Sequence, residues 1–207
     1  MLKNINWVFF DIGSTLSDES DCYRIRFEEI TKNTEVTFEE FEAKVIEFSR
    51  QNRKGDWAAA EYFGLNIPPW HKEVEKLYPE VEYVLHTLHS KGYKIGVIAN
   101  QSPGTVTRLD KWGILKYIDI VLASAEEGVS KPNPEIFRRA LDKAYCLPQN
   151  SVMIGDRLDN DIVPAKKLGM KTIWIKQGYY KYASVYDDLE IADFTVTNLN
   201  ELLDIFF

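Results

Sequence analysis

From residue 79 onward, short apolar runs alternate with stretches in which apolar residues recur at helical spacing. Such alternation is typical of a parallel sheet whose two faces are both covered by helices. The sequence therefore predicts an α/β fold. The predicted strands span 5–10, 93–99, 118–122, 151–155, 171–175 and 193–196, and the predicted helices span 79–91, 103–112, 134–146, 160–168 and 198–206.

The segment 17–77 interrupts this alternation. It is rich in Glu, Lys and Arg, and its apolar residues follow a helical period, as in Tyr23, Phe27 and Ile30. No strand pattern precedes the turn-like residues 66–69. We expect an all-helical insertion, which forms either an accessory lobe or a helical hairpin packed on the sheet.

Polar residues follow several of the apolar runs. Asp11 and Asn100 each come directly after a predicted strand, Asp156 and Asp161 follow another, and Lys131 precedes a Pro-x-Pro pair. Open α/β sheets carry their chemistry at the carboxyl edge, where such residues converge. Two structural alternatives remain, because Asp-x-Gly also forms plain turns and an aspartate at a helix start also serves as a cap.

In type and order, these residues resemble the four signature motifs of the haloacid dehalogenase superfamily of hydrolases, and the resemblance spans nearly the full chain. It implies a Rossmann-like parallel sheet with a small helical cap inserted between the first and second motifs. On this reading, residues 1–16 and 78–207 form the core domain and residues 17–77 form the cap domain.

The resemblance also implies a Mg²⁺-dependent phosphatase that acts on a small phosphorylated metabolite through an aspartyl-phosphate intermediate. A carboxylate repels a phosphate dianion unless a cation bridges them, so the chemistry requires a metal with oxygen ligands. The implied catalytic residues are Asp11 and Lys131. The implied metal ligands are Asp11, the carbonyl of Gly13, Asp156 and Asp161. The implied phosphate-binding residues are Ser14, Thr15, Asn100, Gln101 and Lys131.

Two positions depart from the family pattern. Gly13 stands where family phosphatases generally carry a second aspartate that acts as general acid and base. The absence of such an acid/base group typically lowers the rate by about 10²- to 10⁴-fold. Ala99 stands where a phosphate-binding Ser or Thr is usual, and Gln101 or Ser102 is a candidate replacement. The sequence therefore predicts a slow enzyme.

Residues of the insertion are candidates for the missing functions, although solvated surface is the alternative for each of them. Three acids lie just beyond the first motif and could supply the proton, and three basic residues could hold an anionic end of the substrate. The acids are Asp18, Glu19 and Asp21, and the basic residues are Arg50, Arg53 and Lys54.

Two other functions stay open. The substitutions at Gly13 and Ala99 also suit a non-catalytic protein that binds a phosphorylated ligand. A 2-haloacid dehalogenase also uses an aspartate nucleophile, but halide displacement needs no metal and leaves Asp156 and Asp161 without a role.

Charge, hydropathy and cysteine content limit the classes of partner that this chain can have. The 207 residues carry a formal net charge of −7, which argues against a nucleic-acid partner. No apolar run approaches the ~20 residues of a membrane span, and the polar N-terminus does not resemble a signal peptide. The two cysteines lack CxxC spacing, so neither a disulfide framework nor a zinc site is indicated. We expect a cytoplasmic monomer or weak dimer whose ligand is a small phosphate ester.

Overall fold

The computed structural model describes residues 2–207, and within them a six-stranded parallel sheet runs in the order β5-β4-β1-β6-β7-β8. The predicted α/β fold with a parallel sheet is thus confirmed. The strands are β1 (Trp7–Phe10), β4 (Lys94–Ala99), β5 (Ile120–Ala123), β6 (Ser151–Gly155), β7 (Lys171–Ile175) and β8 (Phe194–Val196).

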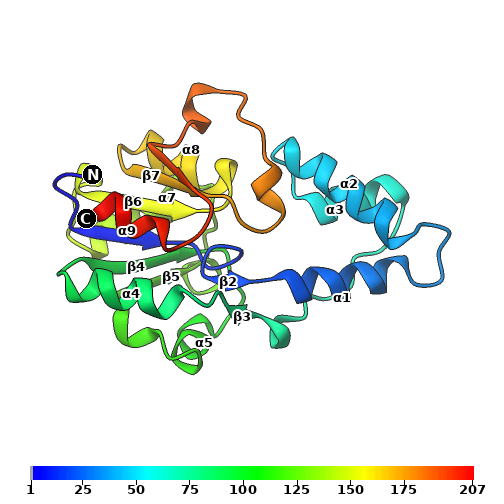
Figure 1. Ribbon diagram of the computed structural model, residues 1–207, viewed down its shortest axis with the longest axis horizontal. Coiled ribbons are helices and arrows are strands. Elements are labelled where there is room, and N and C mark those ends of the chain that lie inside the picture. Colours follow the sequence, from blue (N-terminus) through cyan, green and yellow to red (C-terminus); the bar gives the residue numbers. More distant parts are fainter. Residues whose placement is uncertain (1) are drawn as a thin grey trace.

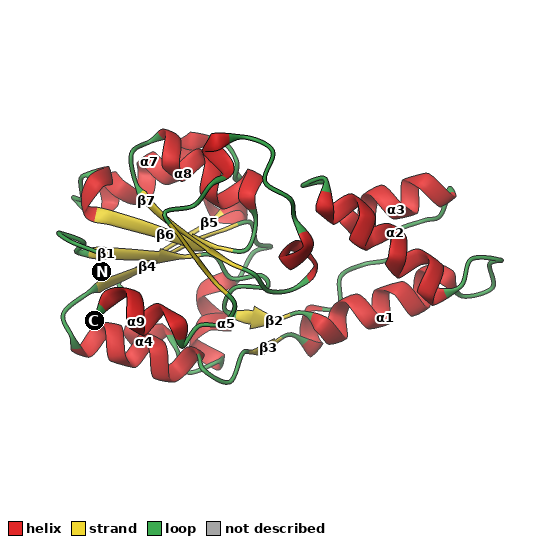
Figure 2. Cartoon of the chain, turned by 45° about the horizontal axis from the view of Figure 1, so that its top comes forward, coloured by secondary structure: helices red, strands yellow, loops and turns green. Residues whose placement is uncertain are grey.

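Helices cover both faces of the sheet (Figure 2). On one side lie α4 (Val81–Ser90), α5 (Thr105–Lys111) and α9 (Glu201–Phe206), and on the other lie α7 (Pro134–Lys143) and α8 (Val163–Lys167). The short helix α6 (Ser124–Glu127) follows β5.

The central strand β1 explains why the sheet needs both layers. Successive side chains of a strand point to opposite faces. Val8 and Phe10 pack in one apolar cluster with Leu85 of α4, whereas Phe9 packs in the other with Phe137 of α7. Since all five side chains are fully buried, β1 is fixed from both sides and its carboxyl end is held in place.

Several predicted boundaries were wrong by a few residues. The helix expected at 160–168 is divided into a π-helical turn at Leu158–Ile162 and the short α8. The helix expected at 134–146 ends at Lys143, and the one expected at 198–206 begins at Glu201. Short 3-10 turns lie at Lys72–Val74, Leu115–Tyr117, Pro148–Asn150, Tyr179–Tyr182 and Asp188–Glu190.

The inserted segment folds into α1 (Ser20–Thr31), α2 (Phe38–Arg50) and α3 (Gly55–Phe63), which project away from the sheet (Figure 1). These helices have an apolar cluster of their own, centred on Phe27 and Phe41. The expectation that the insertion contains no strand was wrong, because β2 (Ser17–Asp18) and β3 (Lys76–Leu77) pair antiparallel at its base. Two-residue strands are too short to leave an alternating pattern in the sequence.

A second connection joins the inserted helices to the sheet layer. The Tyr179 hydroxyl donates to Glu42 of α2 at 2.6 Å, and the Tyr179 ring packs against Phe27 of α1. The side-chain amide of Asn52 donates to the Ser184 carbonyl at 3.2 Å. The helices are therefore held over the carboxyl edge of the sheet from both sides.

Two sequence expectations concern membranes and thiols. Within residues 2–207, every helix is too short or too polar to cross a bilayer. Cys22 and Cys146 are both free thiols.

Candidate active site

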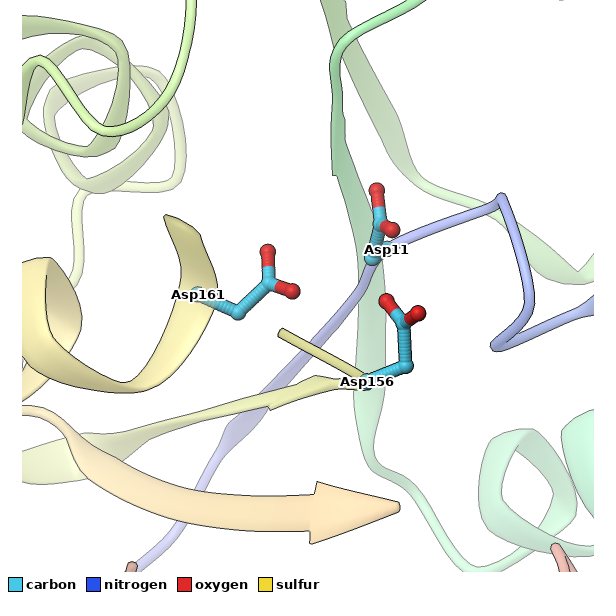
Figure 3. A group of neighbouring side chains, drawn as sticks. All are labelled: Asp11, Asp156 and Asp161. Atoms are coloured by element: carbon cyan, nitrogen blue, oxygen red, sulfur yellow. The ribbon is translucent and has the colours of Figure 1, made fainter. Parts of the chain in front are cut away.

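Three aspartates meet at the carboxyl edge of the sheet, Asp11 from near the start of the chain and Asp156 and Asp161 from one segment far along it (Figure 3). Asp11 follows β1, Asp156 follows β6, and Asp161 lies in the π-helical turn. Each offers a carboxylate oxygen, and these oxygens all lie within 4.8 Å of one another. The side chains are buried, with Asp11 9%, Asp156 2% and Asp161 0% exposed. The three carboxylates that the sequence analysis grouped therefore form one cluster.

The turn after β6 places Asp161 against Gly155. A Cβ atom on Gly155 would lie 2.4 Å from the Asp161 carboxyl carbon, so any larger residue would push this carboxylate away. The Arg157 backbone N–H donates to Asp161 Oδ2 at 3.1 Å, while the Arg157 side chain pairs with Asp159 at 2.6 Å. Asp159 therefore contacts Arg157 outside the cluster, and Asp161 points into it.

Lys131 is the cation of the cluster. Its Nζ lies 2.6 Å from Asp11 Oδ1 and 2.6 Å from Asp161 Oδ1, and the residue is 4% exposed. Burial alone would lower the pKa of the Lys131 ammonium, but the charges of the two carboxylates outweigh it and raise the pKa. Lys131 therefore stays charged and fixes the orientation of Asp11.

Asn100 holds the main chain of Lys131. The Asn100 side-chain amide donates to the Lys131 carbonyl at 2.8 Å, and its oxygen accepts from the Lys131 N–H at 2.8 Å. Both ends of the amide are thus engaged by one residue. The Asn100 side chain therefore positions Lys131, and the expected contact of Asn100 with phosphate stays a prediction.

Negative charge exceeds positive charge in the cluster. Within residues 2–207, no Lys, Arg or His nitrogen lies within salt-bridge distance of the Asp156 carboxylate. Burial, followed by the charges of Asp11 and Asp161, raises the pKa of Asp156 well above its usual value. Burial also raises the pKa of Asp161, to about 6 even with Lys131 beside it. A hard divalent cation with oxygen ligands would offset this repulsion, so the donor set fits Mg²⁺.

The other residues predicted to bind phosphate differ in their positions. Ser14 and Gln101 line the same cavity as Asp11, whereas Thr15 is fully buried and is not among the lining residues. The Ser14 hydroxyl donates to Glu19 at 2.9 Å, and the Gln101 side-chain oxygen accepts from Arg108. Both side chains are therefore engaged with protein groups, and Thr15 lies away from the cavity.

The aspartates open into a cavity of about 610 Å³ that extends to the inserted helices. Two ion pairs stiffen its wall: the buried pair of Arg26 with Asp56 at 2.7 Å, and the partly buried pair of Arg108 with Glu75 at 3.2 Å. Neither pair was predicted from the sequence. Arg26 left a signal, since it falls one helical turn from Cys22 and Ile30 on the buried face of α1. The remaining lining residues include Tyr23, Lys54, Trp57, Trp70, Lys72 and Tyr180.

Of the candidates in the insertion, Glu19 and Lys54 line the cavity. Asp18 and Asp21 contact Lys76 at the base of the insertion instead. Arg53 pairs with Glu61 at 3.6 Å, and Arg50 is absent from the cavity wall as well.

Glu19 is a half-buried acid at the junction between the first motif and α1. Removal from water raises the pKa of Glu19 to about 8, against the hydrogen bond from Ser14, with smaller contributions from Glu75 and Asp11. Glu19 thus holds a proton more readily than an exposed glutamate does.

The comparisons with known proteins all point to the same family. The model of the family described as haloacid dehalogenase-like hydrolase matches residues 8–175. A glyceraldehyde 3-phosphate phosphatase from Pyrococcus furiosus is 37% identical over 132 residues, which cover 61% of this chain and 53% of that protein. A phosphoglycolate phosphatase from Aquifex aeolicus is 32% identical over 129 residues, or 62% of this chain and 58% of that protein.

The chain therefore spans about half the length of the curated relatives it matches. The crystal structure of a HAD phosphatase from Thermococcus onnurineus superposes with a TM-score of 0.67 and 24% identity, covering 98% of both chains. This structural likeness shows the fold.

Proposed function

Because this chain belongs to the haloacid dehalogenase-like hydrolase family, we propose that it is a Mg²⁺-dependent phosphatase acting on a small phosphorylated metabolite. The observation that carries the proposal is the cluster of Asp11, Asp156 and Asp161 around the Lys131 ammonium, at the base of one cavity. In this proposal, residues 1–16 and 78–207 form the catalytic core, and residues 17–77 form the cap.

The role of Asp11 is that of the nucleophile. Its carboxylate oxygen attacks phosphorus, the bond from phosphorus to the leaving oxygen breaks, and an aspartyl-phosphate forms. Water then attacks the same phosphorus and restores the carboxylate. Lys131 orients Asp11 and neutralises charge on the phosphoryl oxygens, while Asn100 holds Lys131 in position.

The acidic cluster would hold the metal. Asp11, the Gly13 carbonyl, Asp156 and Asp161 would bind Mg²⁺, and the cation would supply positive charge that offsets the repulsion between a phosphate dianion and the Asp11 carboxylate. Gly13 lines the cavity beside Asp11, in keeping with this role.

The substrate class follows from the cavity and from the names of the relatives. A volume of about 610 Å³ suits a small organic phosphate. The named relatives act on glyceraldehyde 3-phosphate and phosphoglycolate, both small phosphate esters. Lys54 faces the cavity from the insertion with no acidic side chain within salt-bridge distance in the described residues, which suits a substrate with a second anionic group.

A non-catalytic binder of phosphorylated ligands is the second candidate. It is favoured by one observation: the Ser14 hydroxyl and the Asn100 side-chain amide both donate to protein groups, which removes two donors from phosphate. The intact acidic cluster favours the enzyme, and it also disfavours a dehalogenase, for which Asp156 and Asp161 have no use.

The test is phosphate release from p-nitrophenyl phosphate and from a panel of small phosphate esters, with Mg²⁺ or with EDTA. We expect turnover with Mg²⁺ alone, loss of turnover in Asp11→Asn, and unchanged turnover in the control Asp142→Asn, an exposed aspartate on α7. Binding of phosphate without turnover would favour the second candidate. Turnover that persists in EDTA or in Asp11→Asn would reject the proposal.

A further inference from the structure

The proposed reaction needs a group that moves protons. The leaving oxygen of an alkyl phosphate requires a proton as its bond to phosphorus breaks, and the attacking water must lose one. Asp11 is occupied as the nucleophile, and Asp156 and Asp161 face the cation. Lys131 donates to two of these carboxylates. The proton carrier must therefore be another side chain of the cavity.

We propose that Glu19 is this group, the general acid toward the leaving oxygen and then the general base toward water; the role rests on the proposed phosphatase function. The cavity acids outside the aspartate cluster differ in whether they pair with a basic side chain. Asp56 pairs with Arg26 at 2.7 Å, and Glu75 pairs with Arg108 at 3.2 Å and accepts from Trp70. Among the lining residues that the structure describes, Glu19 alone of these acids has no basic partner within salt-bridge distance.

The Glu19 carboxyl group lies beside Gly13. A Cβ atom built on Gly13 would lie 2.9 Å from Glu19 Oε1 and 3.3 Å from its Oε2. The carboxyl group thus fills the space that a side chain at residue 13 would take, two residues from the nucleophile. Because Gly13 carries no side chain, an acid from the insertion reaches this position.

Neighbouring residues hold Glu19 in this position. The Ser14 hydroxyl donates to Glu19 Oε2 at 2.9 Å, which leaves Oε1 without a protein donor in the described structure. Ser14 itself has a left-handed backbone, with φ 52°. A Cβ atom on Gly178 would lie 2.5 Å from the Ser14 hydroxyl oxygen, so this glycine leaves room for the contact. Ser14 is accordingly a positioning residue for Glu19.

Glu19 gives up one proton in the first half of the reaction and regains one in the second half. As the Asp11 oxygen bonds to phosphorus and the leaving oxygen departs with its electron pair, the Glu19 carboxyl proton moves to that oxygen and an alcohol forms. The Glu19 carboxylate then takes a proton from water as the water oxygen bonds to phosphorus. The bond from phosphorus to Asp11 breaks, and phosphate, the Asp11 carboxylate and protonated Glu19 result.

The test compares two esters that differ in their need for a proton on the leaving group. The p-nitrophenolate ion leaves without being protonated, whereas the propoxide leaving group of propyl phosphate must accept a proton as it leaves. For both esters, kcat/KM covers the steps up to release of the alcohol or phenol. We expect Glu19→Gln to lower kcat/KM for propyl phosphate by about 10²- to 10⁴-fold and that for p-nitrophenyl phosphate by at least about tenfold less. Glu28→Gln, on the exposed face of α1, is the matched control.

A second variant moves the acid instead of removing it. In Gly13→Asp combined with Glu19→Ala, the new carboxyl group takes the vacated space, and Gly13 has no left-handed φ that would oppose the change. We expect this double variant to turn over propyl phosphate faster than Glu19→Ala alone. Equal losses on the two esters in Glu19→Gln, no loss at all, or no recovery in the double variant would each overturn the role of Glu19. Absence of turnover in the unmodified protein would instead reject the proposed function, and this role with it.

Discussion

Replacing Asp156 with asparagine should stabilise the protein without Mg²⁺ and destabilise it with Mg²⁺. Asp156 is 2% exposed and lies within 4.8 Å of two other carboxylates. Two unit charges at that separation repel by about 3 kcal/mol at an effective dielectric constant of about 20. Lys131 offsets part of this repulsion through Asp11 and Asp161. We therefore expect the free energy of unfolding to rise by about 1–3 kcal/mol in EDTA at alkaline pH.

The pH dependence fixes the sign of this prediction. Because the pKa of Asp156 is raised on folding, the folded state binds more protons than the unfolded state above the ordinary value of 3.8. The Mg²⁺-free protein therefore loses stability as the pH rises above 3.8, until the pH exceeds the raised pKa. Asparagine cannot ionise, so the gain in Asp156→Asn should grow with pH.

With Mg²⁺, the unmodified protein should be more stable than Asp156→Asn. A ligand that binds only the folded state stabilises it by about 4.1 kcal/mol at about 1,000 times its Kd, more than the gain expected in EDTA, and Asp156→Asn should lose this stabilisation. Urea unfolding followed by tryptophan fluorescence measures both conditions, with Asp142→Asn as the control. A variant less stable than the unmodified protein in EDTA, or stabilised equally by Mg²⁺, would refute the reasoning.

Four further outcomes follow from particular contacts. Lys131→Met should lower the free energy of unfolding by about 3–5 kcal/mol, because two buried carboxylates lose their cation; a change under 1 kcal/mol on urea unfolding would contradict it. Gly96→Ala should lower the free energy of unfolding by about 1–3 kcal/mol, since its Cβ would lie 2.5 Å from the Phe9 ring. A variant that unfolds at the same temperature as the unmodified protein would count against this packing. His71, between two glutamates at 2.8 and 2.9 Å, should titrate above its usual 6.5 by NMR. The stabilisation it provides is complete below 6.5 and lost as pH rises through the raised pKa, so a His71→Gln variant with unaltered pH dependence would refute it. Lys54→Met should raise KM for esters with a second anionic group and leave KM for p-nitrophenyl phosphate unchanged, and equal effects on the two would be inconsistent with that role.

The sheet and its acidic edge could be predicted because each depends on local pattern. The apolar run before Asp11 and the run before Asp156 have strand length and end abruptly in polar residues. Parallel strands bring such ends together whatever the details of the connecting helices. The convergence of Asp11 and Asp156 therefore follows from the fold class, whereas the position of Asp161 depends on the π-helical turn after β6.

The remaining features depend on contacts between distant residues. The Asn100 amide looks like a phosphate donor in the sequence, but its pairing with the Lys131 main chain spans 31 residues. The partnership of Arg26 with Asp56 requires α1 and α3 to be placed first. The proximity of Glu19 to Gly13 depends on the left-handed backbone of Ser14, which Ser residues seldom adopt and no local pattern predicts.

The most direct test of the account is to identify the residue that carries the phosphoryl group during turnover. Protein mixed with a phosphate ester and Mg²⁺ is quenched in acid within the first turnovers, digested and mapped by mass spectrometry. We expect phosphate on the peptide that contains Asp11, and none when Mg²⁺ is replaced by EDTA. Steady turnover with phosphate on another residue, or with no phosphorylated peptide at any time point, would contradict the central role of Asp11.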